Sequence, residues 1–163
     1  MEQFSDKFLI SVGSIAVNST LLEYSLIKAI SSFISLGGKK SFVINLLFSS
    51  NSLTPLLAKY KDLIIYLLRD NNLYKDELKT ECESLFADLG KLIDLRNRII
   101  HSFWVMGEDG NLKRAKYKKH VGESNNILTE DNLTLDDINN LPNDLLDAVR
   151  KLAKFNKKIL ALI

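Results

Sequence analysis

The residues whose types and spacing are best suited to chemistry lie in the segment Leu92–Trp104, which reads LIDLRNRIIHSFW. An apolar, helix-like run takes on Arg96, Asn97 and Arg98 in succession, and one of the chain's two histidines, His101, follows three residues later. Histidine exchanges protons near neutral pH, and an arginine guanidinium binds phosphate oxygens through several donors. This combination is suited to proton transfer beside a phosphate group.

Arg96 occupies a position where the helical pattern calls for an apolar side chain. A helix is expected from about Tyr74 to Phe103, and Arg96 falls on the same bearing as its apolar stripe. A buried guanidinium without a partner is costly, so Arg96 must be paired, face a cleft or face another subunit. One hypothesis is an ion pair with Glu23, midway along an apolar first helix. The stripe consists of Leu78, Cys82, Leu85, Leu89, Leu92, Ile99 and Phe103.

The other polar residues of this segment also have simpler interpretations. His101 can act as a favourable cation near the end of a helix, and Asp94 with Arg98, one turn apart, predicts a solvent-exposed pair. On an ideal helix Arg96 and His101 lie about 140° apart around the axis. This separation disfavours a tight site within one chain and favours two copies that share a cleft around a two-fold axis.

The stretch Arg96-Asn97-Arg98-Ile99-Ile100-His101 resembles the R-N-x-x-x-H signature of the HEPN superfamily, the all-helical domains of many prokaryotic RNases and toxins. The architecture matches over most of the chain, whereas the motif itself covers only this stretch. The resemblance implies metal-independent cleavage of RNA by attack of a 2′-hydroxyl, which leaves a 2′,3′-cyclic phosphate and a 5′-hydroxyl. It makes Arg96, Asn97 and His101 the catalytic residues: His101 as general acid or base, Arg96 on the phosphate, and Asn97 orienting the histidine or the RNA.

The resemblance also implies partners. HEPN RNases generally use a composite site at a homodimer interface, and the family is often encoded beside a nucleotidyltransferase-type antitoxin. RNA is then the substrate, no metal or other cofactor is expected, and a toxin or phage-defence role follows. Two other readings stay open: a non-catalytic dimeric module of the same superfamily that binds nucleotide, RNA or protein, and an adaptor bundle without a ligand.

Positive charge is concentrated directly after the motif. From Arg96 to His120 there are seven Lys or Arg residues against two acids, a net +5, whereas the whole chain carries +2. Such a segment suits a single-stranded RNA backbone, with a tyrosine for stacking, but lysines also protect the edge of a sheet against aggregation. Both interpretations stay open. The candidate RNA-binding residues are Arg98, Lys113, Arg114, Lys116, Tyr117, Lys118 and Lys119; Glu23 and Asp94 are candidate supporting residues.

The surrounding pattern predicts an all-α fold, a bundle of four or five helices with a small β-hairpin after the motif helix. Helices are expected over 4–34 (with a break at Asn18-Ser19-Thr20 as an alternative), 54–69, 74–103 and 143–163. Thr54-Pro55 is typical of a helix start, and Asp109-Gly110 of a hairpin turn. A short apolar segment at 42–48 adds one or two helical turns, and Trp104 is expected to pack in the core or on the hairpin.

Length and composition favour one domain. The 163 residues are 46% hydrophobic and 26% charged, enough for a single core over residues 1–163. The single cysteine, Cys82, excludes an intrachain disulfide framework and is expected to be buried rather than nucleophilic. The sequence shows no secretory signal pattern and no long uninterrupted apolar run, so no membrane association and a cytoplasmic location are expected.

Overall fold

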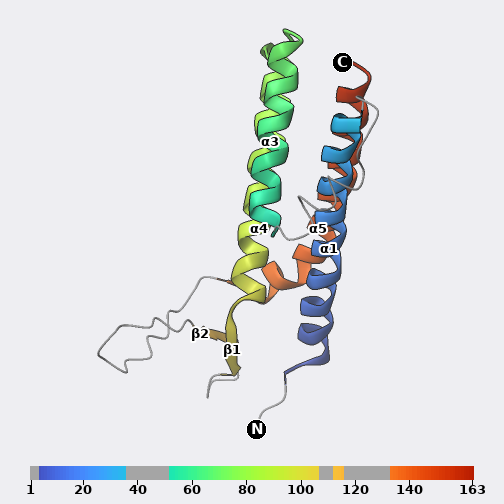
Figure 1. Cartoon of the computed structure of the whole chain (residues 1–163). Coiled ribbons are helices and arrows are strands. Elements are labelled where there is room, and N and C mark those ends of the chain that lie inside the picture. The colour runs from blue at the N-terminus through green and yellow to red at the C-terminus, as the bar shows by residue number, and fades with distance from the viewer. Residues whose placement is uncertain (1–3, 36–51, 107–111, 116–132) are drawn as a thin grey trace, which may run out of the picture.

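The computed structural model describes residues 4–35, 52–106, 112–115 and 133–163. In this part of the chain four helices form the body of the molecule: α1 (Asp6–Ser35), α3 (Leu53–Asp70), α4 (Asp76–Ile100) and α5 (Leu135–Leu160). Figure 1 shows two pairs of long helices, α3 beside α4 and α1 beside α5. The all-α class predicted from the sequence is confirmed.

The core lies along the inner face of each helix. Residues one or two turns apart bury completely, such as Ile15, Leu22 and Leu26 of α1, because helical spacing places them on one side. Tyr60 of α3 is also fully buried; its ring meets Phe86 edge-on with centroids 5.6 Å apart. Its hydroxyl donates to Asn156 Oδ1 of α5 at 2.5 Å, so the polar atom of this core residue is satisfied.

Helix α1 runs without interruption through Asn18-Ser19-Thr20, so the alternative of two shorter helices is wrong. The polar side chains at this point form bonds that leave the helix intact. Asn18 Nδ2 donates to the carbonyl of Pro142 in α5 at 2.9 Å, and the Ser19 hydroxyl donates to the Ile15 carbonyl one turn earlier at 2.6 Å. The polar residues that suggested a break therefore contact neighbouring helices and the helix backbone instead of interrupting α1.

Helix α3 begins at Leu53 with Ser52 as its N-cap, not with Thr54 as predicted. Ser52 has extended backbone angles and its carbonyl accepts from the Leu56 amide at 3.2 Å, so the first turn starts two residues earlier. Pro55 still lies in the first turn, where a missing N–H is tolerated. The consequence is that the Thr54 hydroxyl is not used for capping and can contact another helix.

Helix α5 begins at Leu135, eight residues before the predicted start. Thr134 and Asp137 form a capping box: the Thr134 hydroxyl accepts from the Asp137 amide at 3.1 Å, and Asp137 Oδ2 accepts from the Thr134 amide at 2.8 Å. Pro142 lies inside the helix, which continues through it. In Figure 1 the orange start of α5 runs at an angle to its red remainder, as a proline inside a helix produces.

Helix α4 ends at Ile100, three residues earlier than predicted, and the chain then becomes extended. Strands β1 (Phe103–Met106) and β2 (Leu112–Ala115) pair antiparallel, with Trp104 opposite Arg114. The connection predicted at Glu108–Asn111 lies outside the described residues, so the hairpin as a whole stays a prediction. The predicted turns at Phe42–Phe48 also lie outside them.

Helix α1 is the one described helix long and apolar enough to cross a membrane, judged by length and composition over Asp6–Ile34. A third of its apolar window is buried inside the molecule. The core helix of a water-soluble protein passes the same test, so this finding carries no further conclusion about location.

Candidate functional site

Residues that follow α4 in the sequence cap its C-terminal end. His101 is the C-cap residue, and its amide donates to the Asn97 carbonyl at 3.1 Å. The Ser102 hydroxyl donates to the Arg98 carbonyl, and Trp104 Nε1 donates to the Ile99 carbonyl at 3.0 Å. These three bonds satisfy carbonyls that the end of a helix leaves without partners. They also fix the chain direction after Ile100 and hence the position of the histidine.

The three motif residues meet at this helix end. Arg96 Nη1 donates to Asn97 Oδ1 at 2.9 Å and lies 3.1 Å from His101 Nε2. A guanidinium can only donate, so a hydrogen bond between these two groups requires Nε2 to be the acceptor. A cation, an amide and an imidazole of defined orientation therefore occupy one small region of the surface.

The expectation that Arg96 and His101 are too far apart within one chain is wrong. That estimate applied helical geometry to both residues, but His101 lies beyond the last helical residue, with φ −97° and ψ 15°. The long arginine side chain spans the remaining distance to the imidazole. A second copy of the chain is therefore not required to bring these two groups together.

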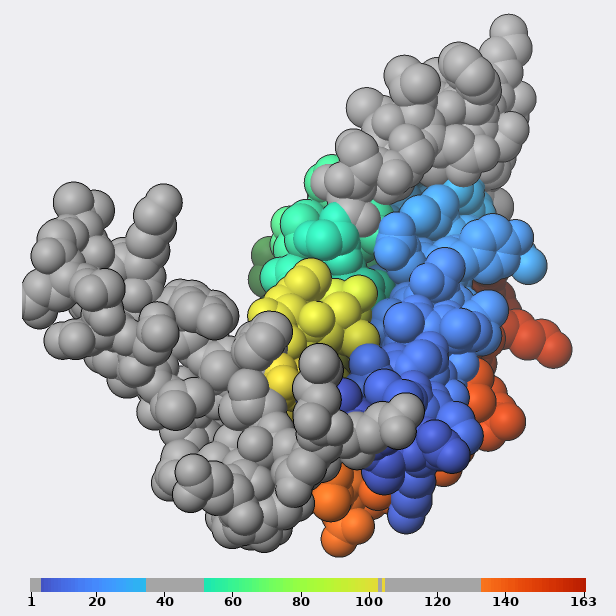
Figure 2. Space-filling model, turned by 90° about the horizontal axis from the view of Figure 1, so that it is seen from below, coloured from blue at the N-terminus to red at the C-terminus, as the bar shows by residue number. Residues whose placement is uncertain are grey.

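Side chains of two further helices, α1 and α3, form hydrogen bonds with the motif residues. Arg96 Nε donates to the Ser19 hydroxyl of α1 at 3.3 Å, and Asn97 Nδ2 donates to the Thr54 hydroxyl of α3 at 3.5 Å. Figure 2 shows the yellow end of α4 lying between blue α1 and teal α3, the two helices that supply these contacts. The motif is thus fixed where three helices converge.

The predicted partner of Arg96 on α1 is corrected by this arrangement. Arg96 binds Ser19, one turn before Glu23, because Ser19 lies on the buried face of α1 whereas Glu23 is only half-buried on its flank. From the sequence, Ser19 was expected in a possible break of the first helix, and Thr54 was expected to cap the second. Only the packing of α1 and α3 against α4 gives them a place in the site.

The site is open to solvent on the side of the histidine. His101 is exposed, while Arg96 and Asn97 are half-buried. Nε and Nη1 of Arg96 are engaged, and among the described residues no acceptor is found for Nη2. Nη2 is therefore the donor of the guanidinium that is left for a ligand, and a phosphate oxygen is an acceptor that suits it.

The remaining candidate residues are only partly placed. Asp94 is exposed and Arg98 is half-buried at the end of α4. The pKa of Asp137 is lowered chiefly by its bonds to the Thr134 amide and hydroxyl, and also by the positive charge of Arg98. Lys113 and Arg114 belong to β2. Nothing further is described for their side chains, and the other basic-segment candidates, Lys116, Tyr117, Lys118 and Lys119, lie outside the described residues.

Cys82 does not belong to this site. It is fully buried in α4, and burial raises the pKa of its thiol to about 11, so the thiol is protonated at neutral pH. Within the described ranges, no group of three or more His, Cys, Asp or Glu side chains is arranged to hold a metal ion. The motif cluster is therefore the one group of side chains from the sequence analysis that this part of the structure brings together.

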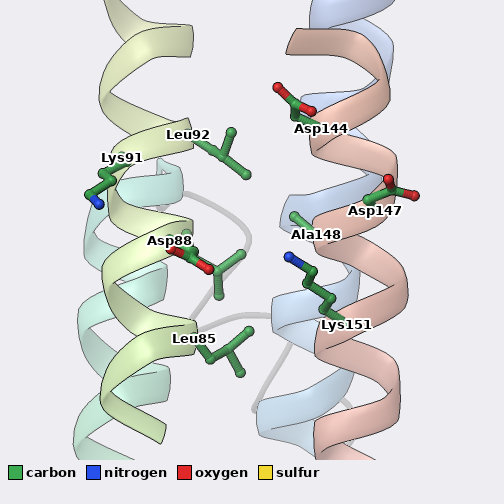
Figure 3. A pocket seen from close by; sticks show the side chains of 9 residues that line it. Leu85, Asp88, Lys91, Leu92, Asp144, Asp147, Ala148 and Lys151 are labelled. Atoms are coloured by element: carbon green, nitrogen blue, oxygen red, sulfur yellow. The ribbon is translucent and has the colours of Figure 1, made fainter. Parts of the chain in front are cut away.

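A cavity lined by described residues lies elsewhere, between α4 and α5 (Figure 3). Leu85 and Leu92 of α4 point across it towards α5, and Lys151 of α5 points into it from the opposite side. Its volume is about 260 Å³, and none of the motif residues lines it. The open helix end, rather than this cavity, carries the groups suited to chemistry.

Comparison with known proteins adds no further information. No family model, no curated protein and no solved structure matches this chain. The resemblance to the HEPN superfamily therefore rests on the motif, on its place at the end of a helix and on the convergence of its side chains.

Proposed function

We propose that the chain is a HEPN-like endoribonuclease that cleaves RNA by 2′-hydroxyl attack without a metal ion. The observation that carries this proposal is the contact of Arg96 Nη1 with both Asn97 Oδ1 and His101 Nε2 at a solvent-exposed helix end. Arg96 lies within hydrogen-bonding distance of Asn97 and of His101, the other two side chains that the motif assigns to the reaction. Their chemistry suits a reaction that moves a proton next to a phosphate.

In the proposed reaction the scissile phosphate binds to the guanidinium edge of Arg96. A phosphate oxygen competes with His101 for Arg96 Nη1, and its arrival frees the Nε2 lone pair. That nitrogen takes the proton of the ribose 2′-hydroxyl as the bond from O2′ to phosphorus forms and the bond from phosphorus to O5′ breaks. The leaving O5′ takes up a proton, and the products end in a 2′,3′-cyclic phosphate and a 5′-hydroxyl.

Asn97 and the basic segment have supporting roles in this proposal. Asn97 holds Nη1 of Arg96 in place, and Arg98 with the basic residues of β2 and beyond attracts the RNA backbone. The resemblance suggests that the protein is a toxin or phage-defence component in the cytoplasm, with a nucleotidyltransferase-type antitoxin as its partner. Growth arrest on expression, relieved by His101→Ala, is the result expected of a toxin.

The experiment is RNA cleavage in the presence of EDTA by wild type, Arg96→Ala, His101→Ala and the control Arg150→Ala. Arg150 lies on α5, exposed and paired with Asp147, so its loss tests the effect of removing a distant arginine. We expect each motif substitution to lower kcat/KM by about 100-fold or more, the usual order for a catalytic donor or base. Equal cleavage by all four proteins would identify a contaminant and end the proposal.

One observation favours a second candidate function, a non-catalytic binding module. Ser19, Arg96, Asn97 and Thr54 connect three helices, so the motif also has a structural use. Under this alternative no variant cleaves RNA, while Arg96→Ala lowers the thermal stability and His101→Ala, at an exposed position, does not. RNA cleavage by the wild type therefore separates the two functions, and thermal unfolding of the same proteins measures the structural use of the motif.

A further inference from the structure

Ser19 is the buried polar residue of α1 that contacts the motif. It is 2% exposed and lies among fully buried apolar side chains such as Ile15 and Leu22. A buried hydroxyl must find partners for both its proton and its oxygen. The proton goes to the Ile15 carbonyl at 2.6 Å, and the oxygen faces Arg96 Nε at 3.3 Å. The direction of this hydroxyl is therefore set by the backbone of α1.

The bond to Ser19 determines which part of the guanidinium faces the solvent. With Nε directed into α1 and Nη1 held by Asn97 and His101, rotation about the end of the side chain is blocked. Nη2 is the one nitrogen of the guanidinium without a partner among the described residues. An arginine without the Nε bond has several rotamers open to it, and an unfixed donor stabilises a developing charge less well.

We propose that Ser19 is a positioning residue: it orients Arg96 so that Nη2 of the guanidinium is held ready to bind an oxygen of the scissile phosphate. This role rests on the proposed ribonuclease function for its effect on catalysis. The orientation itself is a property of the free protein and is measured without RNA.

The test compares Ser19→Ala and Ser19→Thr with a matched control, Ser11→Ala. Ser11 is a second buried serine of α1, 8% exposed, and its hydroxyl donates to Asn139 Oδ1 at 2.9 Å, away from the motif. Ser11→Ala removes one hydrogen bond and Ser19→Ala removes two, so Ser19→Ala is expected to lose somewhat more stability. Ser19→Thr retains the hydroxyl, and thermal unfolding identifies any variant that does not fold.

The first measurement is the nitrogen–proton NMR signal of arginine Nε, assigned to Arg96 by its loss in Arg96→Lys. In wild type we expect a resolved Arg96 signal whose proton exchanges slowly with water. Ser19→Ala is expected to shift this signal and to raise its exchange rate by about 10-fold or more, as loss of a part-buried bond predicts. Ser11→Ala leaves it unchanged, and Ser19→Thr restores it. An Arg96 signal unaffected by Ser19→Ala would overturn the proposal.

The second measurement is steady-state RNA cleavage by the same proteins. Ser19→Ala is expected to lower kcat by about 10-fold with KM nearly unchanged, because a misdirected donor affects the transition state more than binding. Equal losses of kcat in Ser11→Ala and Ser19→Ala would show a purely structural role and overturn the proposal. If wild type does not cleave RNA, the ribonuclease proposal fails, while the NMR result still decides whether Ser19 orients Arg96.

Discussion

At the scale of single residues, Arg96 links the end of α4 to α1, because its side chain contacts Ser19, Asn97 and His101. The types and order of Arg96, Asn97 and His101 predicted a site near a helix end, but ideal helical spacing wrongly disfavoured their meeting within one chain. Their mutual contacts could not be predicted, because they depend on where α4 stops and on the rotamer of a long side chain. Ser19 and Thr54 could not be predicted as supports either, because both belong to helices distant in sequence.

Asn97 offers a prediction at this scale. Asn97→Ala removes the acceptor for Arg96 Nη1 and the donor to Thr54, so we expect kcat for RNA cleavage to fall by about 10-fold. Asn97→Asp keeps the acceptor but places a negative charge beside the guanidinium, which weakens phosphate binding and raises KM. Steady-state kinetics with Asn140→Ala, at an exposed position of α5, as the control distinguishes these effects. An identical change in kcat and KM for both Asn97 variants would argue against this role.

At the scale of helices, periodicity predicted which segments are helical better than where they begin. All four described helices were expected from apolar spacing, yet the starts of α3 and α5 were misplaced. For α3 the Thr54-Pro55 pair was taken as the start, whereas Ser52 is the N-cap; for α5 the start was placed after Pro142, whereas the helix begins with the capping box at Thr134. Proline is tolerated near a helix start and, with a kink, inside it, so it locates a boundary less well than a capping residue.

The capping box of α5 predicts a pH-dependent contribution to stability. The bonds from Thr134 lower the pKa of Asp137 in the folded state, so its stabilising effect is present at neutral pH. This stabilisation is lost as the pH falls below the pKa of an aspartate in the unfolded state, about 3.9, and then through the lower pKa of Asp137 in the folded state. Thr134→Ala is expected to reduce the free energy of unfolding at pH 7 by about 1 kcal/mol.

Urea denaturation of Asp137→Asn and Asp136→Asn at pH 7 and at pH 3 checks this assignment. Asp136 is exposed in the same first turn, but the capping box uses Asp137. We expect Asp137→Asn to be the less stable of the two at pH 7, with the difference narrowing at pH 3 as the wild-type carboxylate becomes protonated. A difference that stays constant with pH would contradict the assignment.

At the scale of the whole molecule, the outer face of α1 is a candidate contact surface for the homodimer that the resemblance to the HEPN superfamily implies. No charged residue lies between Lys7 and Glu23, and side chains on the solvent side of this stretch stay largely exposed. Uncharged faces of two copies can meet without removing ions from water, and exposed apolar patches are typical of interaction sites. The exposed large apolar side chains of this stretch are Leu9 (51%), Ile10 (68%), Val17 (62%) and Leu21 (44%).

Val17→Glu tests this surface. Two added carboxylates facing each other across a two-fold axis are expected to convert a wild-type dimer into a monomer, measured by light scattering after size exclusion. Tyr66→Glu, at a comparably exposed apolar side chain of α3, is expected to leave the dimer intact. A monomeric wild type, or dissociation by both substitutions, would remove the support that α1 gives to a homodimer.

The most direct test of the central claim is the chemistry of the ends that wild type produces from RNA in EDTA. A site is first mapped on a defined oligonucleotide, and the ribose on its 5′ side is then replaced by 2′-deoxyribose. The proposed mechanism predicts that cleavage at that bond stops and that unmodified RNA yields a 2′,3′-cyclic phosphate with a 5′-hydroxyl. Neither of these ends is expected with His101→Ala. Continued cleavage of the deoxy-substituted bond, or ends carrying a 3′-hydroxyl and a 5′-phosphate, would contradict it.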